Sequence, residues 1–465
     1  MKKFAILPFL LIAFYTSAQN FGHYYPYWEE AVGDVVIAYD DGYAILGFAN
    51  SGDMENYLFV LRTNLNGDTL WSKQIDIGNT GSSLGYISAC TQDNMGNLYL
   101  APKYSDSANL IKLSYDFEIV WSRIFAPEIE IKQLLISKDN SLLFTGVNSL
   151  QEHCLYKSDT AGNIIWQSVA LAHFGWQFSL AYSPAILEMD NNNIVMASVL
   201  TSIIGTPMCD LYTFTQDGDT ISSSPMPWIL TDMDTDGNKL IGIAHTESGS
   251  VYWEDTLLVN ILPDGTLLSE KSLIFHPLRV SLYRFVRNTD NQFVATGAVS
   301  SPTMQETQII LHGMSLTGDS LWTNLFLSSR DTWPYDIALS NTPGYVVTGF
   351  FKDSNDKIAP FLLKTDSLGN INTLGINKPK NTYQFSVYPN PANKYVVFDL
   401  KEDLISNNLI QQIVYITDAY GRLADKIIIA GGKTVWDTSN VTSGVYLYHF
   451  YGGTCIKSGK VLILK

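Results

Sequence analysis

Charge, cysteine and long apolar runs are all scarce in this sequence. Charged side chains make up 16% of the 465 residues, and 29 Lys and Arg stand against 45 Asp and Glu, which gives a formal net charge of −16. Such an acidic chain is a poor partner for nucleic acid. A membrane-spanning helix needs a run of about 18 apolar residues, and none is present, so we expect no transmembrane segment although the mean hydropathy is +0.05.

Cysteine and histidine form no metal-binding or catalytic pattern. The four cysteines show no C-x-x-C spacing, and the seven histidines form neither H-x-H nor H-E-x-x-H. Free buried thiols are the simplest interpretation, although four cysteines allow three complete disulfide pairings. We therefore assign no catalytic residue and expect no cofactor, with one Ca²⁺ candidate treated below. The cysteines are Cys90, Cys154, Cys209 and Cys455.

Aromatic and apolar residues, in contrast, are plentiful. Aromatic residues account for 12% of the chain and apolar residues for 46%, which is enough to bury a sizeable core. This composition excludes an intrinsically disordered chain. Low charge combined with many Gly, Asn, Thr and aromatic residues favours an all-β fold over a helical one.

The first residues resemble a secretory signal peptide. Lys2 and Lys3 are followed by an apolar stretch from Phe4 to Tyr15 and by small residues at Thr16–Ala18. This order of basic, apolar and small residues is typical of a signal that is removed on export. We expect residues 1–18 to be the signal and the mature protein to begin near Gln19, outside the cytoplasm. A buried N-terminal strand is the alternative.

The last part of the chain, residues 383–465, differs in composition from the rest. It carries a net charge of +2 and follows a linker at 375–382. Alternating strands, an Asp-x-x-Gly turn and Gly residues before the closing strands predict a small antiparallel β-sandwich. The residues that mark this region are Tyr388, Pro389, Asn390, Pro391, Asp418, Gly421, Ser443, Gly444, Tyr446, Gly459 and Lys460.

These markers, in this order, resemble the type A C-terminal sorting domain of the Bacteroidetes type IX secretion system. The resemblance covers about 80 residues and rests on a motif match. It implies that residues 383–465 bind the type IX machinery and that the protein is exported across the outer membrane, to be secreted or held at the cell surface. An ordinary accessory β-sandwich is the alternative.

The middle of the chain repeats one unit seven times. Each copy ends in a turn followed by a strand that often begins with an aromatic residue, as in Gly67 to Trp71 and Gly318 to Trp322. Three further short strands precede this one in each copy, and the seventh copy ends at Leu368–Thr373. Four strands (A to D) in a repeat of about 50 residues predict a seven-bladed β-propeller over residues 24–374. A solenoid such as a β-helix is the alternative, but its repeats are shorter.

The repeats resemble the broad group of secreted bacterial propellers with D-x-G-x-x-x-x-G and G-D-x-L-W motifs. This resemblance implies a fold and says little about function. Trp71, Trp121, Trp166 and Trp322 begin D strands, and we expect them to pack between blades.

Loop lengths favour one face of the ring for binding. The A–B and C–D turns are short and stereotyped, as tight Asn-Gly and Asp-Gly turns are. The B–C and D–A loops vary, and variable loops on a rigid scaffold often carry function. Aromatic residues beside charged ones suit a glycan or a protein ligand, whereas packing between blades is the alternative for each aromatic ring. The candidate ligand-binding residues are His173, Trp176, Trp228, Tyr252, Trp253, Arg279, Arg284, Arg330, Trp333 and Tyr335.

One stretch has the beginning of a Ca²⁺-binding loop. Asp232, Asp234 and Asp236 alternate as in such loops, but Leu240 and Ile243 stand where the later ligands belong. We expect this stretch to form an A–B turn, and Ca²⁺ binding there is a weak candidate.

The sequence thus predicts an all-β protein, a seven-bladed β-propeller followed by a small β-sandwich, whose propeller binds an extracellular glycan or protein. The alternative is an extracellular hydrolase or lyase that acts on a polysaccharide or a peptide at the same face. Two or more carboxylates converging at the ring centre favour the enzyme, and a smooth aromatic or apolar rim favours binding.

Overall fold

The computed structural model divides the chain into two units, residues 1–373 and 374–465. Each unit is described by itself. The structure describes residues 21–50, 56–77, 85–103, 109–125, 130–147, 152–170, 176–178, 185–202, 207–246, 255–273, 275, 279–300, 307–326, 331–352, 355–371, 385–400, 412–418, 422–429, 433–452 and 455–465.

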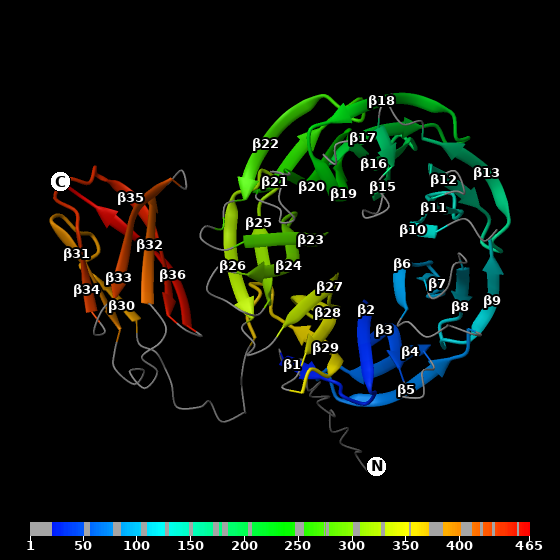
Figure 1. Cartoon of the computed structure of the whole chain (residues 1–465), viewed down its shortest axis with the longest axis horizontal. Helices are drawn as coiled ribbons and strands as arrows, with labels where there is room; N and C mark the ends of the chain where they lie inside the picture. Colours follow the sequence, from blue (N-terminus) through cyan, green and yellow to red (C-terminus); the bar gives the residue numbers. More distant parts are fainter. Residues whose placement is uncertain are drawn as a thin grey trace, which may run out of the picture. The chain divides into compact units, whose positions relative to one another are not determined.

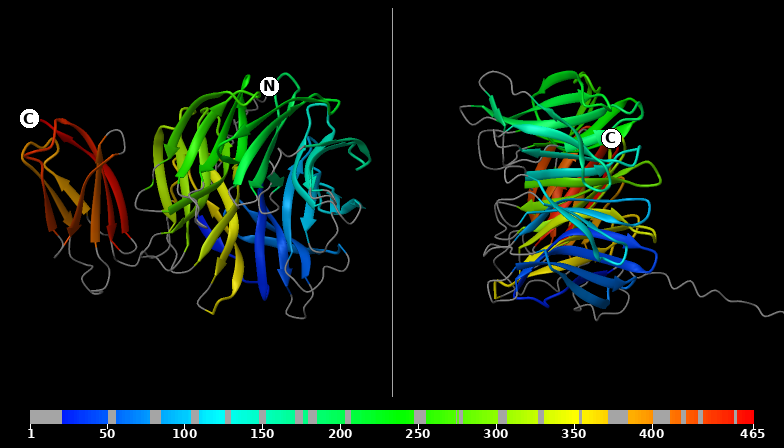
Figure 2. Two further views of the ribbon diagram at one scale, coloured as in Figure 1. Left: turned by 45° about the horizontal axis from the view of Figure 1, so that its top comes forward. Right: turned by 90° about the vertical axis from the view of Figure 1, so that its right-hand side faces the viewer.

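The first unit is a ring of seven antiparallel sheets, which confirms the predicted β-propeller (Figures 1 and 2). The A strands, nearest the axis, are β2 (Glu30–Tyr39), β6 (Tyr86–Gln92), β10 (Glu130–Ile136), β15 (Ala185–Glu188), β19 (Ile229–Asp236), β23 (Arg279–Arg287) and β27 (Thr332–Leu339). The B strands are β3 (Gly42–Asn50), β7 (Leu98–Lys103), β11 (Leu142–Val147), β16 (Ile194–Ser202), β20 (Lys239–Thr246), β24 (Phe293–Ser300) and β28 (Tyr345–Lys352). In the fourth blade, β14 (Trp176–Phe178) also pairs with β16.

The outer half of each blade holds the C and D strands. The C strands are β4 (Asn56–Asn64), β8 (Asn109–Leu113), β12 (His153–Ser158), β17 (Pro207–Phe214), β21 (Asp255–Ile261), β25 (Gln308–Met314) and β29 (Ile358–Lys364). The D strands of the first six blades are β5 (Thr69–Ile75), β9 (Ile119–Ile124), β13 (Ile164–Val169), β18 (Thr220–Met226), β22 (Leu267–Leu273) and β26 (Ser320–Phe326).

The seventh blade takes its outer strand from the other end of the chain. Strand β1 (Phe21–Tyr24) pairs antiparallel with β29, with Phe21 opposite Lys364 and Tyr24 opposite Phe361. The sequence repeat had placed this fourth strand at Leu368–Thr373, and that expectation was wrong, because the described residues up to Ile371 form a turn there and β1 occupies the edge of β29. The ring is therefore closed by pairing the first strand of the unit with the last.

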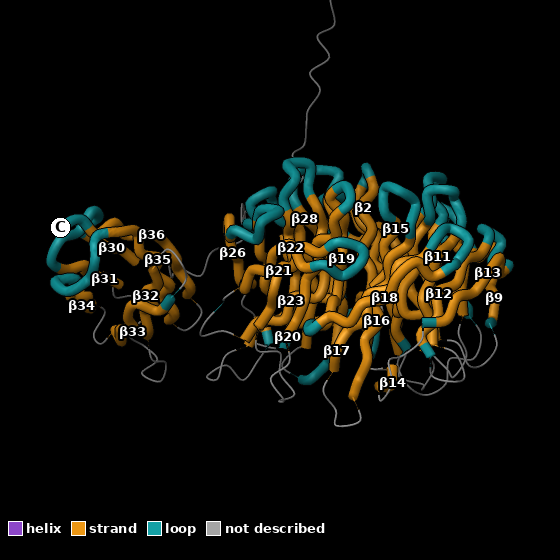
Figure 3. Tube along the Cα trace, turned by 90° about the horizontal axis from the view of Figure 1, so that it is seen from above, coloured by secondary structure: helices purple, strands orange, loops and turns teal. Residues whose placement is uncertain are grey.

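The A–B and C–D turns gather along one face of the ring, drawn in teal in Figure 3. The C–D turns place a glycine at positive φ, such as Gly67 at 82° and Gly369 at 71°, and Phe117 stands at the equivalent position with φ 59°. Positive φ costs little for glycine, so the Asn-Gly and Asp-Gly signals of the sequence correctly located these turns.

The hydrophobic core lies between neighbouring blades. Each of the D-strand tryptophans Trp121, Trp166 and Trp322 covers the C–D turn of the next blade, and a Cβ built on Gly369 would lie 2.3 Å from the ring of Trp322. Trp71 meets Phe117 edge to face, with ring centroids 5.7 Å apart. The expected packing of these four indoles between blades is confirmed.

A polar contact accompanies each of these packing contacts, two residues farther along the D strand. Arg123 Nε donates to the carbonyl of Ala161 at 3.2 Å, and Asn324 Nδ2 donates to that of Leu368 at 2.8 Å. Between the seventh and first blades the Tyr25 hydroxyl donates to the carbonyl of Gly67 at 2.8 Å. The equivalent residues of the other blades are Lys73, Ser168, Ser224 and Lys271, which bond to Phe117, Gly218, Asp264 and Asp319 of the next blade.

The second unit is a sandwich of two antiparallel sheets. One sheet has the order β30 (Phe385–Tyr388), β31 (Tyr395–Leu400) and β34 (Lys433–Asp437). The other has the order β33 (Leu423–Ile429), β32 (Gln412–Asp418), β35 (Gly444–Gly452) and β36 (Cys455–Ile463). Their inner faces share one core that includes Phe398, Trp436 and Phe450. The predicted β-sandwich is confirmed.

Candidate functional site

The A strands share a β-bulge at one level of the ring. The pairing register with the B strand shifts at the same place in six of the seven blades, for example between Gly33 and Val35 and between Pro334 and Asp336. A bulge adds a residue and re-aims side chains, and such bulges are frequent beside functional sites. The extra residues are Asp34, Ser88, Lys132, Thr231, Tyr283 and Tyr335.

Three carboxylates at this level connect neighbouring blades. Asp34 Oδ2 accepts the backbone N–H of Ile87 at 2.9 Å, and Asp336 Oδ2 accepts that of Val36 at 3.0 Å. Each acceptor lies on an A strand and each donor on the A strand of the following blade; Asp232 likewise accepts from Phe285 at 3.0 Å. An A strand is the free edge of its sheet, so some of its N–H groups need a partner outside the sheet. The three carboxylates supply that partner.

The carboxylates and one guanidinium form a single electrostatic cluster around the axis. Burial raises the pKa of Asp34 well above its usual value, and repulsion by Asp336 raises it further. Burial also raises the pKa of Asp336, against the opposing attraction of Arg284. Burial raises the pKa of Asp232 to about 6, again against the attraction of Arg284. We call Asp34, Asp232, Tyr283, Arg284, Tyr335 and Asp336 the axial cluster.

Two tyrosines complete the axial cluster. Burial raises the pKa of Tyr283 to about 12, and burial together with repulsion by Asp34 raises that of Tyr335 to about 12. Both hydroxyls therefore remain protonated at neutral pH and can donate hydrogen bonds. Tyr335 is also 41% exposed, so part of its side chain is accessible to a ligand. Cys90 lies near this level, and burial raises the pKa of its thiol.

The sequence had placed Arg284, Trp333 and Tyr335 in D–A loops, and this placement was wrong. All three lie within A strands, because β23 and β27 begin at Arg279 and Thr332 and each contains a bulge. Arg284 and Tyr335 belong to the axial cluster, and Trp333 lies on the same strand as Tyr335, toward its N-terminal end.

Trp228 has a different role from the expected one. It is 6% exposed and packs with Met226 and Leu230 in the core between the fourth and fifth blades. Trp228 therefore packs between blades, which is the alternative stated for each aromatic ring, since a covered indole offers no face to a ligand. Trp176 and Arg279 begin β14 and β23, and only their backbone is described. His173, Tyr252, Trp253 and Arg330 lie outside the described residues.

Sequence reasoning missed Asp34, Tyr283 and Asp336. A signal was available, because Asp34 and Asp336 are charged residues inside otherwise apolar strands, a few positions before an A–B turn. Asp232 has the same position in its repeat as Asp336, directly after the extra residue of the bulge, but the calcium-loop pattern drew attention to it instead.

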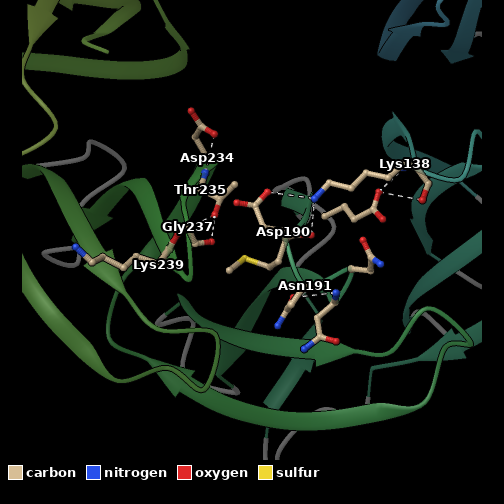
Figure 4. A network of polar contacts seen from close by, with 12 residues as sticks. Lys138, Asp190, Asn191, Asp234, Thr235, Gly237 and Lys239 are labelled. Atoms are coloured by element: carbon tan, nitrogen blue, oxygen red, sulfur yellow. Dashed lines mark hydrogen bonds and ion pairs between the residues drawn. The ribbon is translucent and has the colours of Figure 1, made fainter.

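The calcium candidate is a strand and not a turn. Asp232, Asp234 and Asp236 belong to β19, whose pairing with β20 continues to Asp236 opposite Lys239. Asp232 accepts from Phe285, and Asp234 pairs with Arg287 Nε at 2.8 Å. Figure 4 shows the neighbouring turns, where Lys138 Nζ reaches Asp190 at 3.2 Å and Thr235 bonds within its own turn. In the described part of the chain, no group of three or more His, Cys, Asp and Glu side chains could hold a metal ion.

The cysteines differ in burial. Cys154 and Cys209 are buried and Cys90 is partly buried, and all three are free thiols. The side chain of Cys455 lies outside the described residues.

Asp232 makes the stability of the propeller depend on pH. An acid whose pKa is higher in the folded protein than in the unfolded chain favours folding only while protonated, so the free energy of unfolding falls as pH rises from 3.8 to about 6. We predict that Asp232→Asn is more stable than the parent at pH 7, by on the order of 2 kcal/mol, and equal to it near pH 4. Urea unfolding of both proteins at the two pH values measures the difference. Equal differences at both values would contradict the pKa assignment.

The marker residues of the C-terminal unit surround its last strand. Asn390 Nδ2 donates to the carbonyl of Lys460 and its Oδ1 accepts from the N–H of Leu462, both at 2.9 Å. The adjoining Ala392 exchanges backbone hydrogen bonds of 2.8 Å with Leu462 and Leu464. Asn390 lies between Pro389 and Pro391, each preceded by a cis peptide bond, and Tyr388 ends β30. The segment therefore pairs with the outer edge of β36.

The remaining markers support the same strand or its neighbour. The Tyr446 hydroxyl bonds to the carbonyl of Thr442 at 3.0 Å, and its ring packs on Trp436. A Cβ on Gly459 would lie 2.3 Å from the Tyr448 hydroxyl, so only glycine fits there. Ser443 Oγ accepts from the N–H of Lys465 at 3.0 Å, and Asp418 forms an ion pair with Arg422 at 2.7 Å. Gly444 begins β35, and Lys460 is exposed on β36. Gly421 lies outside the described residues.

Residues 386–464 match the family model described as the secretion system C-terminal sorting domain. The C-terminal unit is a type IX sorting domain. The sorting domain indicates export by the type IX system to the cell surface or the extracellular space. No helix in the described part of the chain has the length and apolar character needed to cross a membrane.

Solved structures similar to this chain are propeller-like and distant in sequence. A protein of unknown function from Bacteroides caccae is 9% identical, with 64% of this chain and 94% of that chain covered and a TM-score of 0.39. Virginiamycin B lyase from Staphylococcus aureus is 11% identical, with 67% and 90% covered and a TM-score of 0.37. Drosophila plexin A, in complex with semaphorin 1b, is 8% identical, with 75% and 88% covered and a TM-score of 0.42. No curated protein matches the chain.

Proposed function

We propose that this protein is a secreted or surface-held propeller that binds an extracellular glycan or protein at the ring centre, on the side of the B–C and D–A connections. The observation that carries the proposal is the axial cluster, in which an exposed tyrosine ring lies beside carboxylates and a guanidinium. An aromatic ring can stack on the C–H face of a sugar or on a side chain, while the charged groups bind hydroxyls or backbone amides. The sorting domain supports export of such a binding module.

A second function is favoured by the paired carboxylates. Asp34 and Asp336 repel each other and both have raised pKa values, as the acid and base of a hydrolase or lyase do. We place this alternative second, because each of the two carboxylates already accepts a backbone N–H from the next blade. That bond uses Oδ2 of each carboxyl group and ties the group to the neighbouring blade.

A glycan and surface-protein array probed with the mature full chain tests the proposal. We expect Tyr335→Ala to weaken binding at least about tenfold, and Tyr335→Phe to retain most of it, because the ring provides the contact. Tyr115→Ala is the matched control, since Tyr115 is 53% exposed on a C–D turn at the opposite face.

Three outcomes separate the two functions. Binding that Tyr335→Ala abolishes supports a binding module. Absence of binding together with cleavage of a polysaccharide or peptide, lost in Asp336→Asn, supports the enzyme. Equal loss of binding in Tyr335→Ala and Tyr115→Ala would contradict the location at the ring centre.

A further inference from the structure

The outer face of one sheet in the sorting domain combines exposed aliphatic side chains with lysine. Leu447 on β35 lies opposite Lys460 on β36 and opposite Thr417 on β32. Side chains alternate between the two faces of a strand, and the neighbours of Leu447, Tyr446 and Tyr448, point toward the core. Leu447 and Lys460 therefore point away from the sandwich. The same face carries Val445, Leu462, Tyr415, Lys426 and Ile428, with Leu464 just beyond the end of β36.

This face is more apolar than a solvent-covered strand surface requires. Ile428 is 50% exposed, Leu464 51%, Val445 43% and Leu447 39%. Val445 lies opposite Leu462, and Leu447 is two residues farther along the same strand, so these side chains adjoin one another, whereas Ile428 lies two strands away on β33. Contiguous apolar surface of this kind on a small domain marks an interaction site.

Among the described residues, the charges of this face are all of one sign. Lys460 is exposed, and no carboxylate in the described part of the chain lies within ion-pair distance of it. Lys426 lies over the ring of Tyr415, with its Nζ 5.4 Å from the ring centroid. The described residues of this face include no Asp or Glu. A partner would therefore need carboxylates within an apolar surface.

The opposite face of the sandwich differs, because Asp399 and Lys433 on it pair with each other. Asp399 Oδ2 pairs with Lys433 Nζ at 3.2 Å and accepts from the Tyr388 hydroxyl at 2.7 Å. The exposed apolar side chain Val435, at 54%, lies on that face. It provides a control surface of similar exposure whose charged groups need no external partner.

We propose that the outer face formed by β33, β32, β35 and β36 is the surface by which the sorting domain docks on the secretion machinery, on an apolar protein surface that presents carboxylates to Lys460 and Lys426. Three observations carry this: the sorting-domain match, the exposed aliphatic side chains on β35 and β36, and Lys460 among them, which makes no ion pair with the described residues. Charge complementarity fixes the partner and the orientation. The inference rests on one part of the proposed function, the export of this protein by the type IX system.

Export of the full chain from a host that has the type IX system tests the docking face. We expect Lys460→Glu and Leu447→Asp each to lower the exported fraction at least about fivefold, because they place a carboxylate against a carboxylate or in an apolar contact. Lys460→Arg keeps the charge and should export as the parent does. Val435→Asp, on the opposite face, is the matched control and should also export normally.

Further measurements keep the test decisive. Protease resistance of the sorting domain in the purified full chain must be unchanged in Lys460→Glu, which alters one exposed side chain. Normal export of both Lys460→Glu and Leu447→Asp, or an equal loss in Val435→Asp, would overturn the docking face. Binding of the full chain to phosphatidylethanolamine–phosphatidylglycerol vesicles, abolished by Lys460→Glu, would assign the face to lipid and overturn the protein partner. If deletion of residues 383–465 leaves export unchanged, the export proposal itself fails.

Discussion

Proline at both Gly22 and His23 should open the propeller ring and lower its melting temperature by about 4 °C or more. In an antiparallel pair, the N–H groups of successive residues point alternately toward the partner strand and away from it. One of these two consecutive residues therefore donates to β29, and two prolines remove that bond whichever it is. Loss of that ladder bond and of the packing that depends on it costs on the order of 3 kcal/mol, which corresponds to a shift of about 4 °C in a domain of several hundred residues.

The effect should be large because β1 holds the first and seventh blades together. Its pairing with β29 brings Tyr25 into position, where its N–H donates to the carbonyl of Pro360 at 3.0 Å and its hydroxyl donates to Gly67 of the first blade. Tyr24 adds a ring contact with Phe351, at 4.1 Å between centroids. Loss of β1 would expose the edge of β29 and remove the interblade contact that the D strands supply elsewhere in the ring.

Alanine at the same two positions is the matched control. It keeps both N–H groups, and a Cβ on Gly22 would meet only Leu363, at 3.8 Å, which is an ordinary contact. Thermal unfolding of the mature full chain, followed by circular dichroism, measures the difference. If the double proline variant has the same melting temperature as the double alanine variant, β1 does not close the ring.

The repeat architecture could be predicted from the sequence because its signals are local. A glycine at positive φ and an aromatic residue four positions later recur in several blades, and both arise from contacts that Gly369 and Trp322 show directly. Ring closure could not be predicted in this way, since β1 has only four residues and its partner, β29, lies more than 300 positions away.

The axial cluster was harder to predict for a related reason. A bulge adds one residue to a strand and so interrupts the alternation of apolar and polar side chains, and the sequence placed Arg284 and Tyr335 in loops. The bonds from Asp34 and Asp336 to the next blade join residues 53 and 300 positions apart. Their partners are backbone N–H groups, which carry no sequence signal at all.

Asn390→Asp should unfold the end of the sorting domain and lower export at least about fivefold. Asn390 is the residue whose side chain both donates to and accepts from β36, at Lys460 and Leu462. Aspartate can still accept from Leu462, but it has no donor and would place a carboxylate oxygen near the carbonyl of Lys460. We expect a loss of about 2 kcal/mol in the stability of this domain, since one hydrogen bond is removed and a repulsion replaces it.

Asn393→Asp is the matched control for this change. Asn393 is exposed in the same segment, and its backbone carbonyl accepts from the Thr438 hydroxyl at 3.0 Å. Limited proteolysis of the purified full chain and the exported fraction in a type IX host measure the two effects. Normal protease resistance of Asn390→Asp would show that the asparagine does not hold β36.

The comparison with Lys460→Glu separates folding of the last strand from its recognition. Asn390 bonds only to the backbone of β36, whereas the side chain of Lys460 projects into solvent. We therefore expect Asn390→Asp to lose protease resistance and export together, and Lys460→Glu to lose export alone. Loss of protease resistance in both variants would mean that the lysine acts on the strand itself, because a docking residue leaves the stability of the free domain unchanged.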